Sequence, residues 1–220
     1  MALSTVASKW LKTQVLLKHP QIAQHIPHTM LFSARNLRSM LARHGMVVLK
    51  PVRGGGGHGV IKVTRASGRY VLAYRASAKV YSSFGAMLGA VNRIRRGRFY
   101  LIQKGIHLAQ VGGRPIDYRV KYVKIGDQWR FRAILGRIAR PGLFVTNICQ
   151  GGRLVPAAEG LRRSLNPQSV VSKKNEMRHL TKISTSLLQQ RFPGLSQLGY
   201  DYGIDQRGHI WILEVNTRPQ

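Results

Sequence analysis

Apolar and polar residues follow two alternating patterns along the first hundred positions. Residues 46–50 are almost entirely apolar, whereas residues 84–91 place Phe, Met, Leu and Val at helical spacing. Ser33 and Gly45 flank another helical pattern, as expected for an N-cap and a C-cap. We therefore predict an α+β fold, with helices at 6–17, 34–44 and about 84–91 and strands at 29–32, 46–50, 60–63, 70–74 and 99–103.

The second half opens with two long segments of alternating polarity, residues 117–125 and 128–137, which predict a β-hairpin. Along the first segment Asp117, Arg119 and Lys121 share one face, and Tyr and Val side chains occupy the other. Two interpretations of the polar face stay open: it lines a site, or it simply meets water.

The chain closes with a helix and a second hairpin. Asn166 and Pro167 are typical of a helix start, and the helix is expected to extend to about Arg191. Residues 200–204 and 209–215 then predict two antiparallel strands joined by residues 205–208.

The final hairpin holds three of the seven acidic residues of the chain, Asp201, Asp205 and Glu214. If Ile204 pairs with His209, then Asp201, Glu214 and Asn216 share one face, with the first two as diagonal neighbours about 7–8 Å apart. Oxygen ligands of this kind suit Mg²⁺. The alternative is that these acids only neutralise nearby arginines.

A glycine-rich loop at residues 53–59 lies between two predicted strands. Glycines let backbone N–H groups approach phosphate oxygens, so the loop is a candidate flap over a triphosphate. It differs from a P-loop because it lacks the Gly-Lys-Ser/Thr ending and precedes a strand. Lys50 is well placed for an α- or β-phosphate, while a plain flexible hairpin is the alternative.

Composition adds a strong charge asymmetry, because 36 Lys and Arg face 7 Asp and Glu for a net charge of +29. Such an excess indicates anionic partners: nucleic acid, an anionic surface or an acidic substrate. The bases are spread along the chain, which favours a basic folded body. No apolar run predicts a membrane span. A single cysteine, Cys149, excludes an internal disulfide, and we interpret it as a packing residue of a cytoplasmic protein.

Together these segments resemble the ATP-grasp superfamily, and more narrowly the YheC/YheD family of endospore-coat-associated ATP-grasp proteins. The resemblance covers nearly the whole chain. It lies in the order and spacing of Ser8-Lys9-Trp10, Val48-Leu49-Lys50-Pro51 with the glycine loop, Leu101–Ile106, Gly113–Arg119, Thr146-Asn147 with Gly151-Gly152, Leu198–Asp201 and Trp211–Pro219.

The resemblance implies two α+β lobes that hold ATP between them. We place an N-terminal lobe with the glycine flap at residues 1–104 and a C-terminal lobe with a magnesium site at residues 105–220. By similarity, the phosphates would meet Lys9, Lys50 and the flap glycines Gly54, Gly55, Gly56 and Gly57. The hinge beside adenine would include Gln103, Lys104 and Ile106.

The remaining roles implied by the resemblance concern catalysis. Asp201, Glu214 and Asn216 would hold one or two Mg²⁺, and Arg119, Arg137 and Asn147 would lie near the γ-phosphate and the acceptor. Members typically phosphorylate a carboxylate, and an amine then displaces the acyl phosphate. The leading hypothesis is therefore an ATP-dependent carboxylate–amine ligase whose acceptor is an acidic small molecule, peptide or polymer.

The sequence departs from the family pattern in two respects. No acidic residue lies between Arg96 and Arg114, where many relatives contact adenine or ribose with one, so we expect weaker nucleotide affinity. The N-terminal domain that usually precedes this module is not seen, so we expect parts of the acceptor site to be missing. Two alternative functions stay open: a spore-coat-associated structural protein that binds ATP with little turnover, and a basic nucleic-acid-binding protein.

Overall fold

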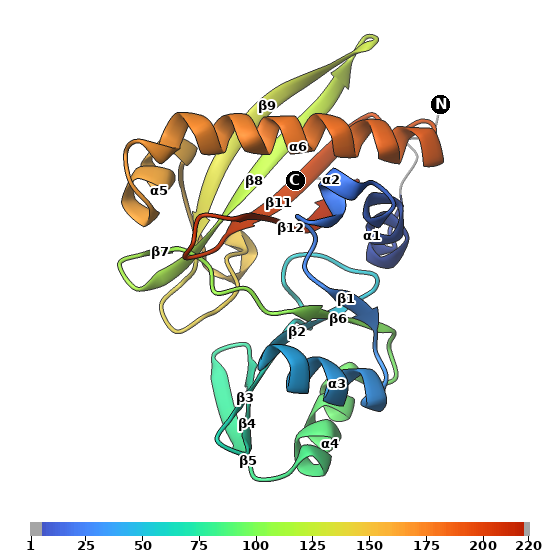
Figure 1. Ribbon diagram of the computed structural model, residues 1–220, viewed down its shortest axis with the longest axis vertical. Coiled ribbons are helices and arrows are strands. Elements are labelled where there is room, and N and C mark those ends of the chain that lie inside the picture. The colour runs from blue at the N-terminus through green and yellow to red at the C-terminus, as the bar shows by residue number, and fades with distance from the viewer. Residues whose placement is uncertain (1–5, 218–220) are drawn as a thin grey trace. The chain divides into compact units, whose positions relative to one another are not determined.

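The structure, a computed structural model, describes residues 6–217 and divides the chain into two compact units (Figure 1). Unit 1 comprises the described residues of Met1–Ile26 and His107–Gln220, and unit 2 is Pro27–Ile106. The two units have separate hydrophobic cores.

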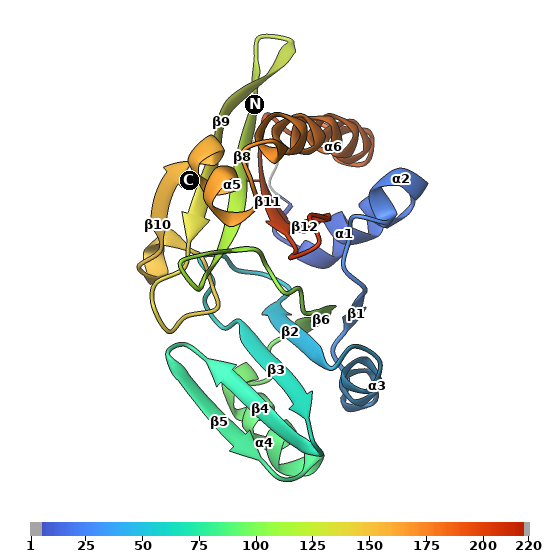
Figure 2. The same ribbon diagram turned by 60° about the vertical axis from the view of Figure 1, so that its left-hand side comes forward.

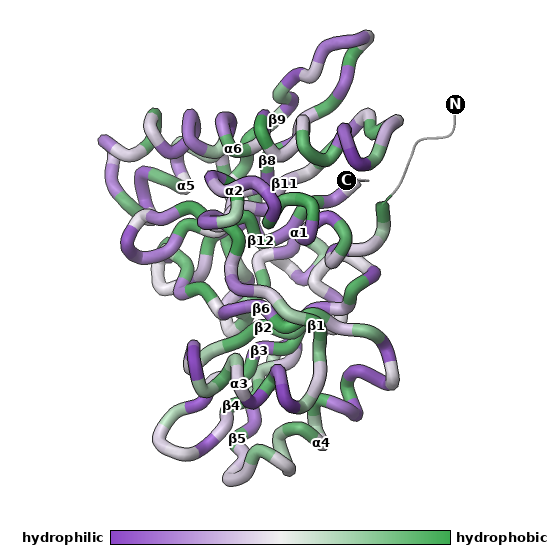
Figure 3. Tube along the Cα trace, turned by 45° about the vertical axis from the view of Figure 1, so that its right-hand side comes forward, coloured by the Kyte–Doolittle hydropathy of each residue, from purple (hydrophilic) through white to green (hydrophobic). Residues whose placement is uncertain are grey.

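Unit 2 is one six-stranded antiparallel sheet in the order β1-β6-β2-β3-β4-β5, with two helices on one face. Apolar side chains of β2 and β3, such as Leu49 and Ile61, pack against Leu37 of α3 and Met87 of α4. In Figure 3 the strands of this sheet carry green, apolar stretches between white and purple ones. Its elements are β1 (Thr29–Leu31), α3 (Ala34–His44), β2 (Met46–Pro51), β3 (Ile61–Ala66), β4 (Arg69–Tyr74), β5 (Ser77–Tyr81), α4 (Phe84–Arg95) and β6 (Tyr100–Lys104).

The predicted elements of unit 2 are confirmed, with one omission. The Ser33 hydroxyl accepts a hydrogen bond from the Asn36 N–H at the start of α3, and Gly45 ends that helix with φ +68°. The missed element is the edge strand β5, whose residues are almost all exposed. Its sequence lacks the apolar alternation that identifies a half-buried strand.

Unit 1 contains a second antiparallel sheet in the order β10-β9-β8-β11-β12, with β7 paired to β8 outside this path. In Figure 2 the helices α5 and α6 lie beside the strands of this sheet. The elements are α1 (Lys9–Leu17), α2 (Pro20–Ala23), β7 (Gln110–Val111), β8 (Arg114–Ile125), β9 (Gln128–Ile138), η1 (Ile148–Gln150), β10 (Arg153–Pro156), α5 (Ala157–Ser164), α6 (Ser169–Arg191), β11 (Gln197–Ile204) and β12 (Ile210–Asn216).

One face of this sheet packs against α6, where the spacing of two tyrosines on β11 matches the spacing of two threonines on the helix. Tyr200 and Tyr202 lie two residues apart on β11, so their side chains point to the same face. Their hydroxyls meet Thr185 and Thr181 of α6, four residues apart, at 2.8 Å each. Four residues of helix rise about 6 Å and two residues of strand about 6.8 Å. The tyrosine hydroxyls are thus satisfied although all four residues are buried.

The N-terminal helices belong to unit 1, which differs from the division at residue 104 expected from the sequence. Leu16, Ile22 and Ile26 are buried in the core of unit 1, and α1 packs against α6 and β12. These apolar residues pack in one core with residues that follow position 107. The second boundary, at Ile106, lies close to the expected one.

Several local features differ from the sequence patterns. Residues 20–23 form the helix α2, which was not among the predicted elements, and α6 begins at Ser169, whose N–H donates to the Asn166 side chain. The strand β10 and the helix α5 were also not predicted from the sequence. Cys149 is exposed, so it is not a buried packing residue.

In the described part of the chain, no helix combines the length and the apolar character needed to cross a membrane.

Candidate functional site

The final hairpin has a different register from the predicted one, yet it keeps the predicted face. Ile204 pairs with Ile210 instead of His209. The Asp205 carboxylate explains the longer turn, because its Oδ1 accepts from the N–H groups of Arg207 and His209 at 2.9 and 3.0 Å. A register shift between Asp201 and Tyr202 then sets Asp201 directly opposite Glu214. The two carboxylates are direct neighbours rather than diagonal ones.

Charged residues of four strands form a row on the face of this sheet opposite the tyrosines. Arg119 of β8 lies opposite Asp201 of β11, and Asp117 of β8 lies opposite Arg137 of β9. The polar face of β8 therefore lines a charged cluster rather than only meeting water. We call Asp117, Arg119, Arg137, Asp201 and Glu214, together with Lys9, the charged cluster.

Arg137 joins two carboxylates in the buried part of the charged cluster. Its Nε and Nη2 donate to Asp117 at 2.8 and 2.6 Å, and Nη2 lies 3.1 Å from Asp201 Oδ1. Only 6% of its side chain is exposed. Burial lowers the pKa of Arg137, but Asp201 and Asp117 more than offset that effect and raise it. Arg137 is therefore charged at any pH at which the protein is folded.

Asp201 is the most heavily contacted acid of the cluster. Arg119 donates from Nε and Nη2 to its two oxygens, and Asn216 Nδ2 lies 3.5 Å from Oδ2. Burial raises the pKa of Asp201, but Arg137 and Arg119 outweigh it, and the pKa lies below its ordinary value. Asp201 is therefore ionised at neutral pH.

Glu214 meets the N-terminal helix at the other end of the charged cluster. Lys9 Nζ lies 3.4 Å from Glu214 Oε1, and the Glu214 side chain is 19% exposed. Ser8 starts this helix by accepting a hydrogen bond from the Leu11 N–H, which fixes where Lys9 projects. Three carboxylates thus face three cations in this cluster.

Lys12 is a site residue that the sequence reading missed. It lies one turn after Lys9 and is buried, with Nζ donating to the Val6 carbonyl at 2.7 Å. Burial lowers the pKa of Lys12 to about 8, with Glu214 opposing the shift and Lys9 adding to it. The sequence feature that could have identified Lys12 is its position three residues after Lys9, because residues three apart lie on the same face of a helix.

The donor set of Asp201, Glu214 and Asn216 fits a hard cation such as Mg²⁺. All three side chains offer oxygen, and a rotation of the Asn216 amide brings its Oδ1 to the position of Nδ2. The ion pairs expected from the alternative interpretation are also present, since Arg119, Arg137 and Lys9 each contact one of the carboxylates. The cluster therefore combines metal-type ligands with fixed cations.

Asn147 lies in the loop that follows β9, directly before η1. Its backbone carbonyl accepts hydrogen bonds from the N–H groups of Gln150 and Gly152 at 2.9 and 3.2 Å. A Cβ on Gly152 would lie 2.3 Å from the Thr146 carbonyl oxygen, so this tight turn requires glycine there. The recognised Asn147 and Gly151-Gly152 motif thus forms one compact turn.

Unit 2 brings two of the predicted nucleotide-binding residues together. Lys50 Nζ donates to Gln103 Oε1 at 2.7 Å, and Gln103 Nε2 donates to Thr29 Oγ1 at 3.2 Å. Gln103 is buried and Lys50 is half-buried. Lys104 is the next residue along the chain, and Ile106 is the last residue of the unit.

The glycine loop owes its course to backbone conformations that favour glycine. Gly54, Gly56 and Gly57 have φ values of +119°, +64° and +74°. The loop is fixed at its end, where the Tyr100 hydroxyl donates to the Gly59 carbonyl at 2.9 Å. A Cβ on Gly59 would approach that hydroxyl to 2.8 Å. The loop is therefore held by a hydrogen bond at Gly59, and its other residues include glycines with positive φ.

Comparison with known families decides the classification. The family model described as YheC/D-like ATP-grasp matches residues 2–220. The chain belongs to this family. The resemblance inferred from the sequence motifs is thereby confirmed.

Two curated proteins of Bacillus subtilis (strain 168) are similar to this ATP-grasp chain. It is 29% identical over 223 residues to the endospore coat-associated protein YheD, covering 98% of the chain and 49% of YheD. For the endospore coat-associated protein YheC the identity is 24% over 220 residues, covering 96% and 59%. The chain thus spans about half the length of the curated relatives that it matches.

Solved structures with the same fold are ATP-grasp enzymes. N5-carboxyaminoimidazole synthase from Aspergillus clavatus, in complex with ADP and 5-aminoimidazole ribonucleotide, gives a TM-score of 0.61 at 12% identity, covering 100% of this chain and 46% of the enzyme. D-alanyl-alanine synthetase A from Vibrio cholerae gives 0.57 at 13%, covering 97% and 55%. At these identities the likeness establishes the ATP-grasp fold, an α+β architecture.

Proposed function

We propose that this protein binds Mg-ATP and acts as an ATP-dependent carboxylate–amine ligase. The observation that carries the proposal is the charged cluster of unit 1, where Asp201 and Glu214 lie opposite each other beside Arg119 and Arg137. The family supports nucleotide binding, and the solved relatives by fold include a synthase with bound ADP and a D-alanyl-alanine synthetase.

The residues of unit 1 divide into oxygen ligands and fixed cations. Asp201, Glu214 and Asn216 are the proposed metal ligands, and Mg²⁺ bound there supplies charge neutralisation for the transferred phosphoryl group. Arg119 and Arg137 are already held by carboxylates, so they stabilise developing negative charge without first being ordered. Lys9 and Asn147 are proposed to contact phosphate and acceptor groups.

The residues of unit 2 are proposed to bind the nucleotide. Lys50 is proposed to supply a positive charge for an α- or β-phosphate, and its hydrogen bond to Gln103 places it beside a second proposed nucleotide-binding residue. Backbone N–H groups of Gly54, Gly55, Gly56 and Gly57 are the proposed flap donors. Gln103, Lys104 and Ile106 are proposed to border the adenine.

The proposed reaction has two steps. A carboxylate oxygen of the substrate attacks the γ-phosphorus, and the bond to the β–γ bridging oxygen breaks, which gives an acyl phosphate and ADP. An amine then attacks the acyl carbon, loses a proton, and expels inorganic phosphate to leave an amide. The acceptor is proposed to be an acidic small molecule, peptide or polymer, because a net charge of +29 concentrates anions near the protein.

Isotope transfer tests the ligase proposal directly. Acidic peptides with ¹⁸O-labelled carboxylates are incubated with ATP, Mg²⁺ and a panel of amines, and the released phosphate is analysed by mass spectrometry. We expect one ¹⁸O in each phosphate and one amide per ADP. ADP release with unlabelled phosphate indicates simple hydrolysis and contradicts the ligase assignment.

A second candidate is a structural role at the spore coat with little ATP turnover. It is favoured by the names of the two curated relatives, both of which are called endospore coat-associated proteins. Under this proposal Glu214→Gln, expressed in a sporulating host, leaves localisation at the coat unchanged. Loss of that localisation in the variant, with normal expression, would argue against a purely structural role.

A further inference from the structure

The charge of the protein is divided unequally between its units. Unit 2 contains fifteen Lys and Arg, eleven of them Arg, and no Asp or Glu. All seven acids lie in unit 1, beginning at Asp117. Unit 2 is therefore an acid-free basic body, and its cations have no carboxylate of their own unit to pair with.

The arginines of unit 2 are held by aromatic rings and carbonyls instead. The Arg38 guanidinium lies 4.1 Å from the ring centre of Phe84, and that of Arg95 lies 3.9 Å from the ring centre of Phe32. Arg95 also donates to the Arg98 carbonyl at 3.0 Å. Contacts of this kind orient a guanidinium but leave its charge uncompensated.

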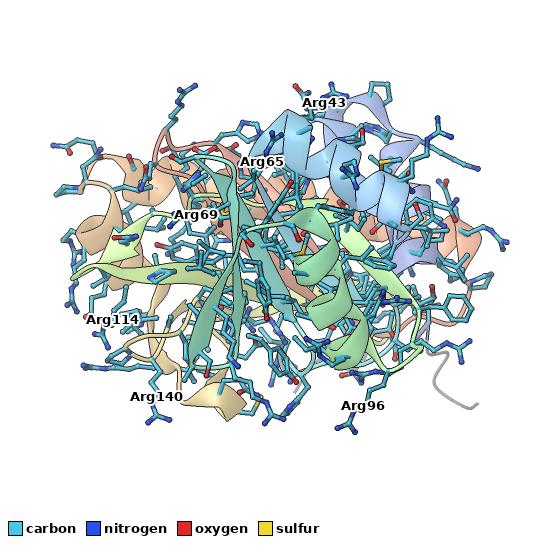
Figure 4. The ribbon with its side chains drawn as sticks, turned by 90° about the horizontal axis from the view of Figure 1, so that it is seen from below. Arg43, Arg65, Arg69, Arg96, Arg114 and Arg140 are labelled. Atoms are coloured by element: carbon cyan, nitrogen blue, oxygen red, sulfur yellow. The ribbon has the colours of Figure 1, made fainter. Side chains whose placement is uncertain are left out.

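The densest group of these cations lies at the end of α4. Arg93, Arg96 and Arg98 are exposed there, and Phe99 is 83% exposed. Arg96 has a left-handed backbone with φ +51°, followed by Gly97, so the chain turns sharply out of the helix. In Figure 4 the Arg96 side chain points away from the body of the protein. We call Arg93, Arg96, Arg98 and Phe99 the α4-end patch.

The α4-end patch has a rigid base. The Phe99 carbonyl accepts from the Val52 N–H at 2.9 Å, and Arg98 donates to the Tyr100 hydroxyl at 3.2 Å. An exposed phenyl ring on a fixed backbone costs little conformational entropy when a ligand covers it. The ring therefore offers an exposed apolar platform, and the three arginines of the patch precede it within six residues of the chain.

We propose that the α4-end patch binds single-stranded nucleic acid. Guanidinium groups bind phosphates in a planar, bidentate manner, and an exposed aromatic ring stacks on an unpaired base. The predominance of Arg over Lys and the exposed Phe99 favour this partner over an acidic polypeptide, which lacks flat aromatic bases. The proposal does not depend on the ligase function, because neither ATP nor the charged cluster takes part.

Fluorescence anisotropy with a labelled oligothymidylate, in the absence of ATP, tests the proposal. The triple variant Arg93→Gln/Arg96→Gln/Arg98→Gln is compared with Arg153→Gln/Arg162→Gln/Arg207→Gln, which removes the same charge from exposed positions of unit 1. We expect the first triple to weaken binding by about tenfold more than the second, and to reduce the slope of log affinity against log salt by about two. Phe99→Ala is expected to weaken binding about tenfold, whereas Phe99→Tyr retains it.

Three results would overturn the proposal. The first is no binding by the wild type at low salt, and the second is an equal loss in the two triple variants. The third is displacement of the oligonucleotide by polyglutamate at an equal concentration of charge, which identifies an acidic polypeptide as the partner. Far-UV circular dichroism and thermal melting of each variant establish that a loss of binding is not a loss of fold. If the patch triple fails to fold, the Phe99→Ala and Phe99→Tyr pair decides the outcome.

Discussion

The two units of this protein use positive charge in opposite ways. In unit 1 the cations Arg137, Arg119 and Lys9 each contact a carboxylate, and the resulting cluster lies largely buried on one face of a sheet. In unit 2 no carboxylate exists, and arginines such as Arg38 and Arg95 lie on aromatic rings. Arginine thus forms buried ion pairs within a site in unit 1, whereas in unit 2 it stacks on aromatic rings without a carboxylate partner in that unit. The following predictions test that difference, from the largest effect to the smallest.

Removal of Arg137 should be the most damaging single change. Arg137→Met leaves the buried Asp117 carboxylate without its cationic partner, and it leaves Arg119 as the remaining arginine on Asp201, so we expect a loss of about 3–5 kcal/mol in the free energy of unfolding. Arg69→Met on the surface of unit 2 is the matched control, with an expected change within about 0.5 kcal/mol. Urea unfolding followed by far-UV circular dichroism measures both. Equal effects of the two variants would contradict the contrast between the units.

Replacement of Asp201 should cost less, because Arg137 retains Asp117. We expect Asp201→Asn to lower the free energy of unfolding by about 2–3 kcal/mol at pH 7. The folded pKa of Asp201 lies below its ordinary value, so its contribution is present above the unfolded pKa of about 4 and is lost as pH falls through the folded pKa. Unfolding curves for the wild type and the variant should therefore converge between pH 5 and pH 3. A constant difference over that range would show that Asp201 is not stabilised as an anion.

Lys12 offers a prediction of opposite sign. Its folded pKa of about 8 lies below the unfolded value of 10.5, so burying its charge costs stability below pH 8, and the cost is relieved as pH rises toward 10.5. We expect Lys12→Met to stabilise the protein by roughly 1–2 kcal/mol at pH 7, with a smaller gain at pH 10. The exposed neighbour Lys18→Met is the control. Destabilisation by Lys12→Met at pH 7 would mean that the attraction of Glu214 outweighs burial.

The smallest expected effect is a difference between the two units in how added salt changes their stability. Added NaCl screens the repulsion among the fifteen cations of unit 2, and we expect that unit to gain about 0.5 kcal/mol between 0.05 and 0.5 M salt. The buried pairs of unit 1 are screened far less. All three tryptophans lie in unit 1, so their fluorescence follows that unit, while amide hydrogen exchange in β2, β3 and β6 follows unit 2. An equal salt-induced gain in the stability of the two units would contradict the assignment of the charge repulsion to unit 2.

Local sequence patterns predicted most elements, since caps and periodicity are read within a few residues. Ser33 and Gly45 delimit α3 as expected, and the face shared by Asp201, Glu214 and Asn216 followed from strand alternation. The register did not follow, because it depends on the Asp205 side chain gathering two backbone N–H groups. No pattern in the local sequence predicted these hydrogen bonds to the Asp205 carboxylate.

Long-range packing was beyond the sequence patterns. The placement of α1 in unit 1 depends on Leu16 packing with residues more than 90 positions later, and no local periodicity encodes it. For the same reason the role of Lys12 was missed, since its burial comes from that packing. The pairing of Arg137 with both Asp117 and Asp201 likewise needed three strands to be assembled.

The central claim is that Asp201, Glu214 and Asn216 form a metal site for a bound nucleotide, and calorimetric titration of ATP tests it most directly. Titrations with and without Mg²⁺ are compared for the wild type, Glu214→Gln and the control Glu176→Gln, whose carboxylate pairs with Lys173 on α6. We predict that Mg²⁺ strengthens ATP binding in the wild type and in Glu176→Gln, and that Glu214→Gln loses at least about tenfold of that gain. An unchanged Mg²⁺-dependent affinity in a folded Glu214→Gln protein would contradict the assignment, leaving the cluster as a set of structural ion pairs.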